Sequence, residues 1–203
     1  MYWSKSMAIS SADATALIED ADDRGMTLMV GHTFLFNPAV RWIKRYLHDG
    51  SIGRLYHLYF HRPGLGPIRH DVNTLWVFAP HDLSMLRYWL GQVPNAVKDR
   101  GESYLKPGVE DVVLLTHNCP ERVMASVHVN WLDPVKTRRV TIVGERRMIV
   151  FDDAHPTEKL RVYNKGASYQ PNRAEGHRHS AYNQSGSFLP ARGRMTAVSR
   201  SCG

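Results

Sequence analysis

The segment DVNTLWVFAPHDLSMLRYWLG, residues 71–91, predicts an apolar helix around which the rest of the chain is organised. Its large apolar residues recur at helical spacing and predict a core-facing stripe: Leu83, Met85, Leu86, Trp89 and Leu90. Pro80 suits the first helical position and Gly91 suits the helix end. His81 then falls in the first turn, where the helix dipole favours the neutral imidazole that a general base requires. A purely structural histidine is the alternative, and the residues alone favour it.

Two helices and two strands are predicted before this segment. Residues 10–25 predict a helix that is capped by Ser10 or Ser11 and buries Ala14, Leu17, Ile18 and Ala21. Residues 27–34 predict a short strand that follows it. Asn37 and Pro38 are typical of a helix start, and Gly50 of its end. Residues 55–62 alternate and predict a half-buried strand, with His57, Tyr59 and His61 on one side.

After Gly91 the sequence predicts an antiparallel sheet. The predicted strands are short and rich in Val, Ile, Leu and Thr: residues 96–100, 111–117, 123–132, 138–143, 148–151 and 160–163. In the clearest of them Val123, Ala125, Val127, Val129 and Trp131 share one face, and the other face is polar enough to meet water or a second copy of the chain. Residues 167–203 have no periodicity and predict a disordered tail.

Composition limits the partners. The 203 residues carry a formal charge of +7, but five arginines and one glutamate after residue 166 supply +4 of it, which leaves +3 for the rest. We therefore expect no nucleic-acid partner. No apolar run reaches membrane-spanning length, so we expect no membrane partner. Two distant cysteines, Cys119 and Cys202, favour a reducing cytoplasm, and no histidine set has the spacing of a metal site.

The loop at residues 63–73 is a candidate binding segment. It is rich in glycine and proline, is flanked by Arg62 and contains Arg69 and His70, and arginine pairs readily with phosphate or carboxylate. A solvated surface loop is an equal alternative. Its Gly64 and Gly66 do not form a dinucleotide fingerprint, because position 69 is arginine and no helix starts there. Neither that fingerprint nor a P-loop occurs in the chain.

Several stretches, in order, resemble the Gfo/Idh/MocA oxidoreductases, most closely the branch that acts on nucleotide-linked or related sugars. They are SKSMA (4–8), LMVGHTFLFNPAV (28–40), GSIGRLYHLYFHRPGLGPIRHDVNTLW (50–76), APHDLSMLRYWLG (79–91), ESYLKPGVEDVVLLT (102–116) and HVNWLDPVKTRRVTIVGERRMIVFDD (128–153). The resemblance implies an α+β fold, an open, mainly antiparallel sheet with helices on one face, preceded by the last helix and strand of a Rossmann domain. It divides the chain into 1–34, a remnant of the dinucleotide-binding domain, 35–166, the substrate and dimerisation domain, and the tail.

The resemblance also implies functional residues. The family's Glu-Lys-Pro motif falls on Ser4-Lys5-Ser6, so Lys5 is the implied lysine near the nicotinamide, and His81 is the implied acid/base. Alcohol oxidation needs a base for the hydroxyl proton and a cation beside the developing alkoxide. The implied substrate-binding residues are Arg62, Arg69 and Asn73. The implied contacts to NAD or NADP are Lys5 and His32.

This sequence departs from the family pattern in ways that affect function. Serines flank Lys5, and Val77 stands where the family often places an acidic or amide residue four positions before the histidine. The resemblance implies a dinucleotide-binding half before Lys5, and we expect it to be missing here. We therefore expect a sugar or nucleotide-sugar oxidoreductase present as a fragment that is inactive alone. The alternative is a non-catalytic sheet domain that self-associates or pairs with intact homologues.

Overall fold

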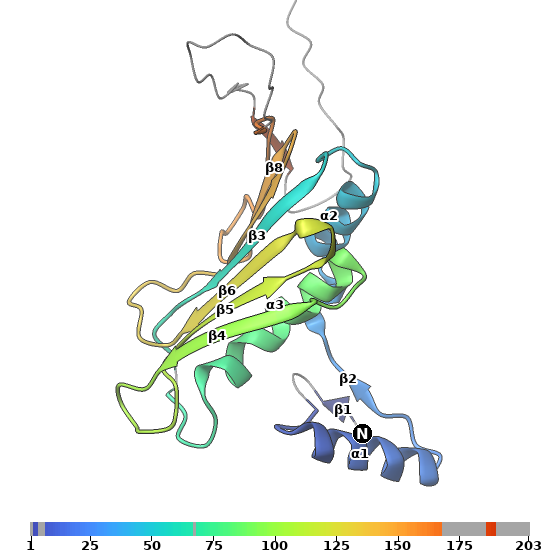
Figure 1. Ribbon diagram of the computed structural model, residues 1–203, viewed down its shortest axis with the longest axis vertical. Helices are drawn as coiled ribbons and strands as arrows, with labels where there is room; N and C mark the ends of the chain where they lie inside the picture. The colour runs from blue at the N-terminus through green and yellow to red at the C-terminus, as the bar shows by residue number, and fades with distance from the viewer. Residues whose placement is uncertain (1, 4–6, 67, 168–185, 190–203) are drawn as a thin grey trace, which may run out of the picture.

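The computed structural model describes residues 2–3, 7–66, 68–167 and 186–189. The helices are α1 (Ser11–Asp23), η1 (Thr33–Phe36), α2 (Pro38–His48), α3 (Thr74–Leu90) and η2 (Pro120–Arg122). The strands are β1 (Tyr2–Trp3), β2 (Met29–Val30), β3 (Leu55–Arg62), β4 (Ala96–Glu102), β5 (Val112–Asn118), β6 (Met124–Asn130), β7 (Arg139–Gly144), β8 (Met148–Asp152), β9 (Leu160–Tyr163) and β10 (Gly186–Leu189). Figure 1 shows their arrangement.

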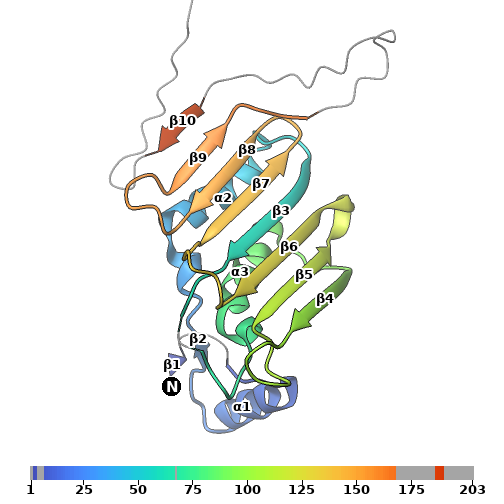
Figure 2. The ribbon, with the colours of Figure 1, turned by 90° about the vertical axis from the view of Figure 1, so that its left-hand side faces the viewer.

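One open sheet forms the main layer of the molecule. Its strand order is β10-β9-β8-β7-β3-β6-β5-β4, and all neighbouring strands are antiparallel except the central pair β3 and β6. Helices α2 and α3 cover one face, and the other face is open toward the viewer in Figure 2. The expected α+β fold, an open and mainly antiparallel sheet with helices on one face, is therefore confirmed.

The core lies between the sheet and the two helices. The predicted inward face of β6 is confirmed, because Val123, Ala125, Val127, Val129 and Trp131 are all buried. From the helix side come the apolar residues of α3, and the Trp89 ring stacks on the Phe60 ring of β3 with centroids 5.9 Å apart. The Trp89 indole N–H also donates to the carbonyl of Val40 at 3.0 Å. This bond satisfies a buried donor and fixes α2 against α3.

Helix α2 forms where the sequence predicts it. The Asn37 side chain accepts a hydrogen bond from the Ala39 N–H at 2.9 Å, and Pro38 occupies the first helical position. Both features lower the cost of starting a helix, because the first N–H groups have no partner within it. Val40 and Ile43 then face the sheet and are fully buried.

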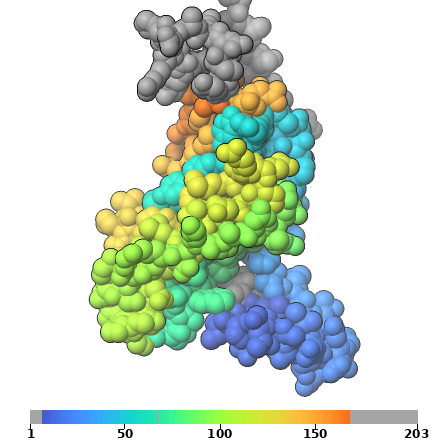
Figure 3. Space-filling view, viewed as in Figure 1, coloured from blue at the N-terminus to red at the C-terminus, as the bar shows by residue number. Residues whose placement is uncertain are grey.

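Strand β1, helix α1 and strand β2 form a small β–α–β unit. Tyr2–Trp3 of β1 pairs in parallel with Met29–Val30 of β2, and α1 begins where Ser10 accepts from the Asp13 N–H. The space-filling view shows this unit as a lobe below the sheet (Figure 3). Two expectations are corrected here. Ile18 is 45% exposed and of the predicted stripe only Ala21 is buried, and the predicted strand over 27–34 is limited to β2 because η1 begins at Thr33.

The tail differs from its prediction at four residues. Gly186–Leu189 form β10, which pairs antiparallel with β9 at the edge of the sheet. An edge strand exposes unpaired N–H and C=O groups, and these can bind a short segment whose sequence has no helical or alternating pattern. The rest of the predicted tail beyond Ala167 lies outside the described residues.

Candidate functional site

His81 lies in the middle of α3 and not in its first turn, which corrects the prediction. The helix begins seven residues earlier because the Asn73 side chain accepts from the Trp76 N–H at 3.2 Å. Pro80 therefore lies inside the helix, where it cannot donate the usual bond to the preceding turn. The helix dipole acts mainly on the terminal turn, so it does not account for the protonation of His81. The imidazole depends on its tertiary neighbours.

The ring of Phe34, carried by η1, lies against His81. The two ring centroids are 5.2 Å apart with their planes tilted by 58°, a favourable aromatic arrangement. On the same Phe34 ring lies the guanidinium of Arg62, with its central carbon 5.0 Å from the centroid. Phe34 thus joins a histidine from α3 to an arginine from the end of β3. The short 3-10 helix after β2 is what brings that ring to α3.

Arg62 is held by a buried ion pair with Asp82, the residue after His81. Its Nε lies 2.9 Å from Asp82 Oδ2, and its Nη2 lies 2.6 Å from Asp82 Oδ1. Arg62 is 7% exposed and Asp82 is 1% exposed. Burial raises the pKa of the Asp82 carboxyl, and the facing Arg62 guanidinium opposes that shift. The pair places two compensating charges beside the Phe34 and His81 rings.

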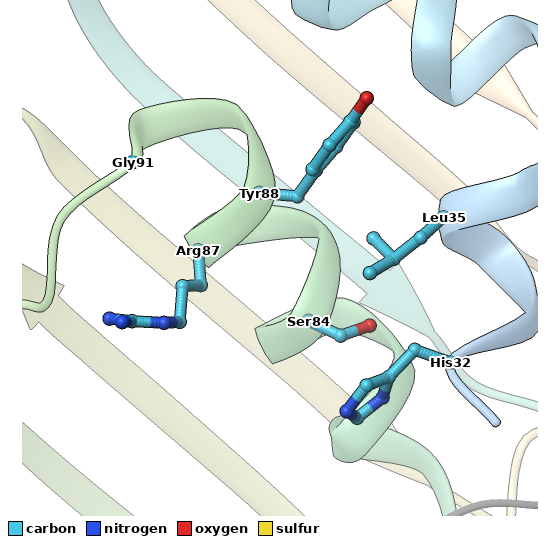
Figure 4. A pocket seen from close by; sticks show the side chains of 6 residues that line it. All are labelled: His32, Leu35, Ser84, Arg87, Tyr88 and Gly91. Carbon is cyan, nitrogen blue, oxygen red and sulfur yellow. The ribbon is translucent and has the colours of Figure 1, made fainter. Parts of the chain in front are cut away.

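His32 and Ser84 line an open pocket of about 450 Å³ on the side of α3 that faces η1. The other lining residues are Leu35, Arg87, Tyr88 and Gly91. Figure 4 shows His32 directed toward Ser84, while Arg87 and Tyr88 extend from α3 in different directions. The Ser84 hydroxyl donates to the carbonyl of His81 at 2.8 Å, so this pocket adjoins the His81 turn. Most of its lining surface is apolar, and His32, Ser84 and Arg87 supply polar groups that can form hydrogen bonds to a ligand.

Two other residues implied by the resemblance, Arg69 and Asn73, precede the first residue of α3. Arg69 is exposed and pairs with Asp71, with Nε 2.9 Å from Oδ1. Asn73, besides capping the helix, donates to Glu110 Oε2 at 2.6 Å. At 1.5 Å per residue Asn73 is about 12 Å from His81 along the helix axis. The side-chain hydrogen bonds of Arg69 and Asn73 therefore join them to the carboxylates of Asp71 and Glu110 near the helix start, away from the Phe34 ring.

The sequence interpretation missed Asp82 and Phe34, and it named Arg62 without its partner. A signal for Asp82 was present, because a carboxylate within an apolar helix needs a buried partner. The alternation of β3 placed Arg62 on the same side as Leu58 and Phe60, which indicated that it faces inward. Lys5, the other implied catalytic residue, lies outside the described residues, and its role stays a prediction.

The residues near α1 do not fit the pyrophosphate of a dinucleotide. Such a group binds at a helix N-terminus that follows a glycine-rich turn. The chain before α1 contains no glycine, and the Ser10 hydroxyl oxygen already accepts from Asp13 N. The Asp13 carboxylate also stands in the first turn, where it would repel a phosphate. We therefore assign no dinucleotide contact to α1.

Within residues 2–3, 7–66, 68–167 and 186–189, no group of three or more histidine, cysteine, aspartate or glutamate residues is arranged to hold a metal ion. The helices of the same residues include none that is long and apolar enough to cross a membrane.

Comparison with known proteins assigns the domain. Residues 40–150 match the model of the GFO/IDH/MocA C-terminal domain. A curated relative, 4-carboxy-2-hydroxymuconate-6-semialdehyde dehydrogenase of Sphingobium sp. (strain NBRC 103272 / SYK-6), is 26% identical over 111 residues, which is 51% of this chain and 35% of the relative. The chain spans about a third to a half of the curated relatives it matches.

Solved structures share the fold at low identity. UDP-N-acetylglucosamine 3-dehydrogenase from Acidithiobacillus ferrooxidans superposes with a TM-score of 0.67 at 22% identity, over 85% of this chain and 53% of that chain. An inositol dehydrogenase homologue from Azotobacter vinelandii, solved with NADH and myo-inositol, gives a TM-score of 0.75 at 14% identity, over 93% and 49%. With more than half of its residues matched by the family model, the chain belongs to the Gfo/Idh/MocA family, and residues 40–150 form its C-terminal domain.

Proposed function

We propose that this protein is an NAD(P)-dependent oxidoreductase of the Gfo/Idh/MocA type that acts on a hydroxyl group of a sugar or nucleotide sugar, with His81 as the acid/base. The observation that carries the proposal is the position of His81 within the family domain, half-buried, against Phe34 and beside the pocket lined by His32 and Ser84. The substrate class is supported by the names of the solved neighbours, a UDP-N-acetylglucosamine 3-dehydrogenase and an inositol dehydrogenase homologue. The cysteine content favours a cytoplasmic location.

The described residues account for the proton part of the reaction. An alcohol loses its hydroxyl proton as it is oxidised, and the imidazole of His81 is the group proposed to accept that proton. The Arg62–Asp82 pair and Phe34 act as positioning residues, because they pack against the His81 turn without adding a net charge. We propose that Lys5 stabilises the alkoxide and that His32 borders the nicotinamide. Arg69 and Asn73 remain proposed substrate contacts at the start of α3.

Sugar binding tests the proposal directly. With the chain labelled at its histidine rings, addition of myo-inositol or UDP-N-acetylglucosamine should shift the His81 ring resonances in a saturable way, because a base that takes a hydroxyl proton lies within hydrogen-bond reach of it. His81→Gln assigns the resonances, and the exposed His48 should not respond. A folded sample whose His81 signal is unchanged by every sugar and nucleotide sugar in such a panel contradicts the proposed function.

We also propose that two copies associate through the open face of the sheet. Two exposed apolar side chains on neighbouring strands of that face support this proposal. Leu114 of β5 is 49% exposed, and Met124 of β6 is 44% exposed. In this family the corresponding sheet is the expected dimerisation surface. The same association would serve the alternative function, a non-catalytic sheet domain that pairs with itself or with intact homologues.

Leu114→Lys is expected to weaken this association at least about tenfold, or 1.4 kcal/mol, because the ammonium would be desolvated in the interface without a partner. Light scattering after size exclusion, over a range of concentrations, measures the effect. Val135→Lys is the matched control, since Val135 is also an exposed apolar residue but lies in the loop after β6. A wild-type chain that stays monomeric throughout argues against the interface.

A further inference from the structure

A pair of histidines lies at the centre of the open sheet face. His61 of β3 and His128 of β6 are register partners in the parallel pair of the sheet. Both side chains are on the face opposite α2 and α3, since their strand neighbours Phe60 and Val127 are buried in the core. Figure 2 shows β3 and β6 side by side in the middle of this face. The proposed hydride-transfer site uses neither histidine.

Hydrogen bonds connect the two rings to their neighbours. The Nδ1 atoms of His61 and His128 are 3.2 Å apart. The Tyr59 hydroxyl lies 3.0 Å from the same His61 Nδ1, and the Asn130 amide nitrogen lies 3.2 Å from His128 Nε2. The Asn130 amide is oriented from its other side, because its oxygen accepts the Leu132 N–H at 3.2 Å.

These contacts determine where the protons lie. An amide nitrogen only donates, so His128 Nε2 must be an acceptor and the ring proton must be on Nδ1. His128 Nδ1–H then donates to His61 Nδ1, which is unprotonated and also accepts from the Tyr59 hydroxyl. The proton of His61 is consequently on its Nε2. Both rings are neutral, and the single lone pair of His61 Nδ1 is shared between two donors, the His128 Nδ1–H and the Tyr59 hydroxyl.

We propose that His61 and His128 form a neutral hydrogen-bonded pair that makes the centre of the open sheet face sensitive to acid. A proton added to His61 Nδ1 would face the N–H of His128. A proton added to His128 Nε2 would face the amide N–H of Asn130. Either protonation turns a hydrogen bond into a contact between two donors. Acidification therefore separates the two rings and weakens the packing between β3 and β6.

The charged surroundings agree with this behaviour. Burial lowers the pKa of His61, with Asp133 raising it and Arg139 lowering it. Burial also lowers the pKa of His128, the neighbouring His61 lowers it further, and Asp133 opposes both. Arg139 of β7 is itself paired with Asp152 of β8. On the pair's own strands the ring of His57 is the other titratable imidazole, and burial lowers its pKa as well.

The sign of the pH effect follows from these directions. Both histidines bind protons more weakly in the folded chain than in the unfolded chain, whose ordinary pKa is about 6.5. The stabilisation is therefore complete above about pH 6.5 and is lost as the pH falls through the lower folded-state values. A metal ion is a poorer explanation of the short Nδ1–Nδ1 contact, because His128 would have to surrender the Nδ1 proton that the Asn130 orientation requires.

Nitrogen-15 spectra of the labelled histidine rings, recorded on the 203-residue chain over a pH titration, test the proposal. At about pH 7.5 we expect the proton of His128 on Nδ1 and that of His61 on Nε2, with His61→Gln and His128→Gln giving the assignments. Asn130→Asp should move the His128 proton to Nε2, because a carboxylate accepts a hydrogen bond from Nε2–H. The same carboxylate should raise the pKa of His128. A proton on Nε2 of His128 in the wild type, or no rise in Asn130→Asp, would overturn the pair.

Urea unfolding supplies a second measurement. Between about pH 7.5 and about pH 5.5 the folding equilibrium constant should fall several-fold more for the wild type than for His61→Gln/His128→Gln. His117 is also buried, and neither ring nitrogen has a hydrogen-bond partner among the described residues, so it contributes to acid sensitivity too. Because every variant retains His117, its effect cancels in the comparison. An equal fall in both proteins would show that the pair is not acid-sensitive.

Discussion

Asp82→Ala is expected to lower the free energy of unfolding by about 3–5 kcal/mol, because it leaves the Arg62 charge buried without a partner. The guanidinium is enclosed among the end of β3, α3 and the Phe34 ring, and it makes three hydrogen-bond contacts to the Asp82 carboxylate. Water cannot replace that carboxylate where Arg62 is only 7% exposed. Urea unfolding at neutral pH measures the loss.

The double substitution Arg62→Met with Asp82→Leu is expected to be far less costly than either single change. Burial raises the pKa of Asp82 despite the adjacent guanidinium, which means that desolvation offsets much of the attraction between the charges. Apolar side chains of similar volume remove both the attraction and the desolvation, so the double variant should be near neutral or more stable. If it is as unstable as Asp82→Ala, the pair itself stabilises the fold.

An exposed pair serves as the control for this experiment. Asp20 and Arg24 on α1 form an ion pair at 2.8 Å, with side chains 51% and 66% exposed. Asp20→Ala should change the free energy of unfolding by at most about 0.5 kcal/mol, because water screens the charges and solvates the remaining one. A loss of less than about 1 kcal/mol for Asp82→Ala would place the buried pair in the same class and contradict its assigned role.

The sequence predicted helix α3 but placed its first residue too late in the chain. Pro80 is typical of a first helical position, and that signal outweighed the capping signal of Asn73 seven positions earlier. In the structure the Asn73 cap and the buried Thr74 begin the helix, and the surrounding core retains Pro80 inside it. Local sequence rules favour Pro80 over Asn73 as the helix start, because they do not include the tertiary packing that offsets the backbone hydrogen bond lost at Pro80.

Strand faces were predictable, whereas contacts between strands were not. Alternation alone placed Val127 inward and His128 outward, and both placements are confirmed. The parallel pairing of β3 with β6 joins segments more than sixty residues apart, and nothing local specifies it. The contact of His61 with His128 depends on that register, and the contact of Arg62 with Asp82 depends on how α3 packs against the end of β3, so both required the structure.

His81→Ala is expected to lower kcat for the proposed sugar oxidation by about 10²–10⁴-fold, the usual effect of removing a positioned general base. KM should change little, because the imidazole acts on the reacting proton more than on the bound ground state. The assay measures formation of reduced nicotinamide, with the family's dinucleotide-binding domain supplied either in the same polypeptide or as a separate domain. The acidic limb of the pH profile should disappear together with the imidazole.

Added imidazole distinguishes a catalytic His81 from a structural one. A base that only transfers a proton can be replaced in part by imidazole from solution, so the rate of His81→Ala should rise with imidazole concentration while the rate of the wild type does not. If His81 is only structural, the substitution removes its packing against Phe34 and lowers the free energy of unfolding by about 0.5–1.5 kcal/mol. Added imidazole would then not raise the rate. His48→Gln, which changes an exposed histidine in the last turn of α2, should leave kcat, the pH profile and the free energy of unfolding unchanged. Unchanged turnover in His81→Ala would return His81 to the structural role that its sequence context alone favoured.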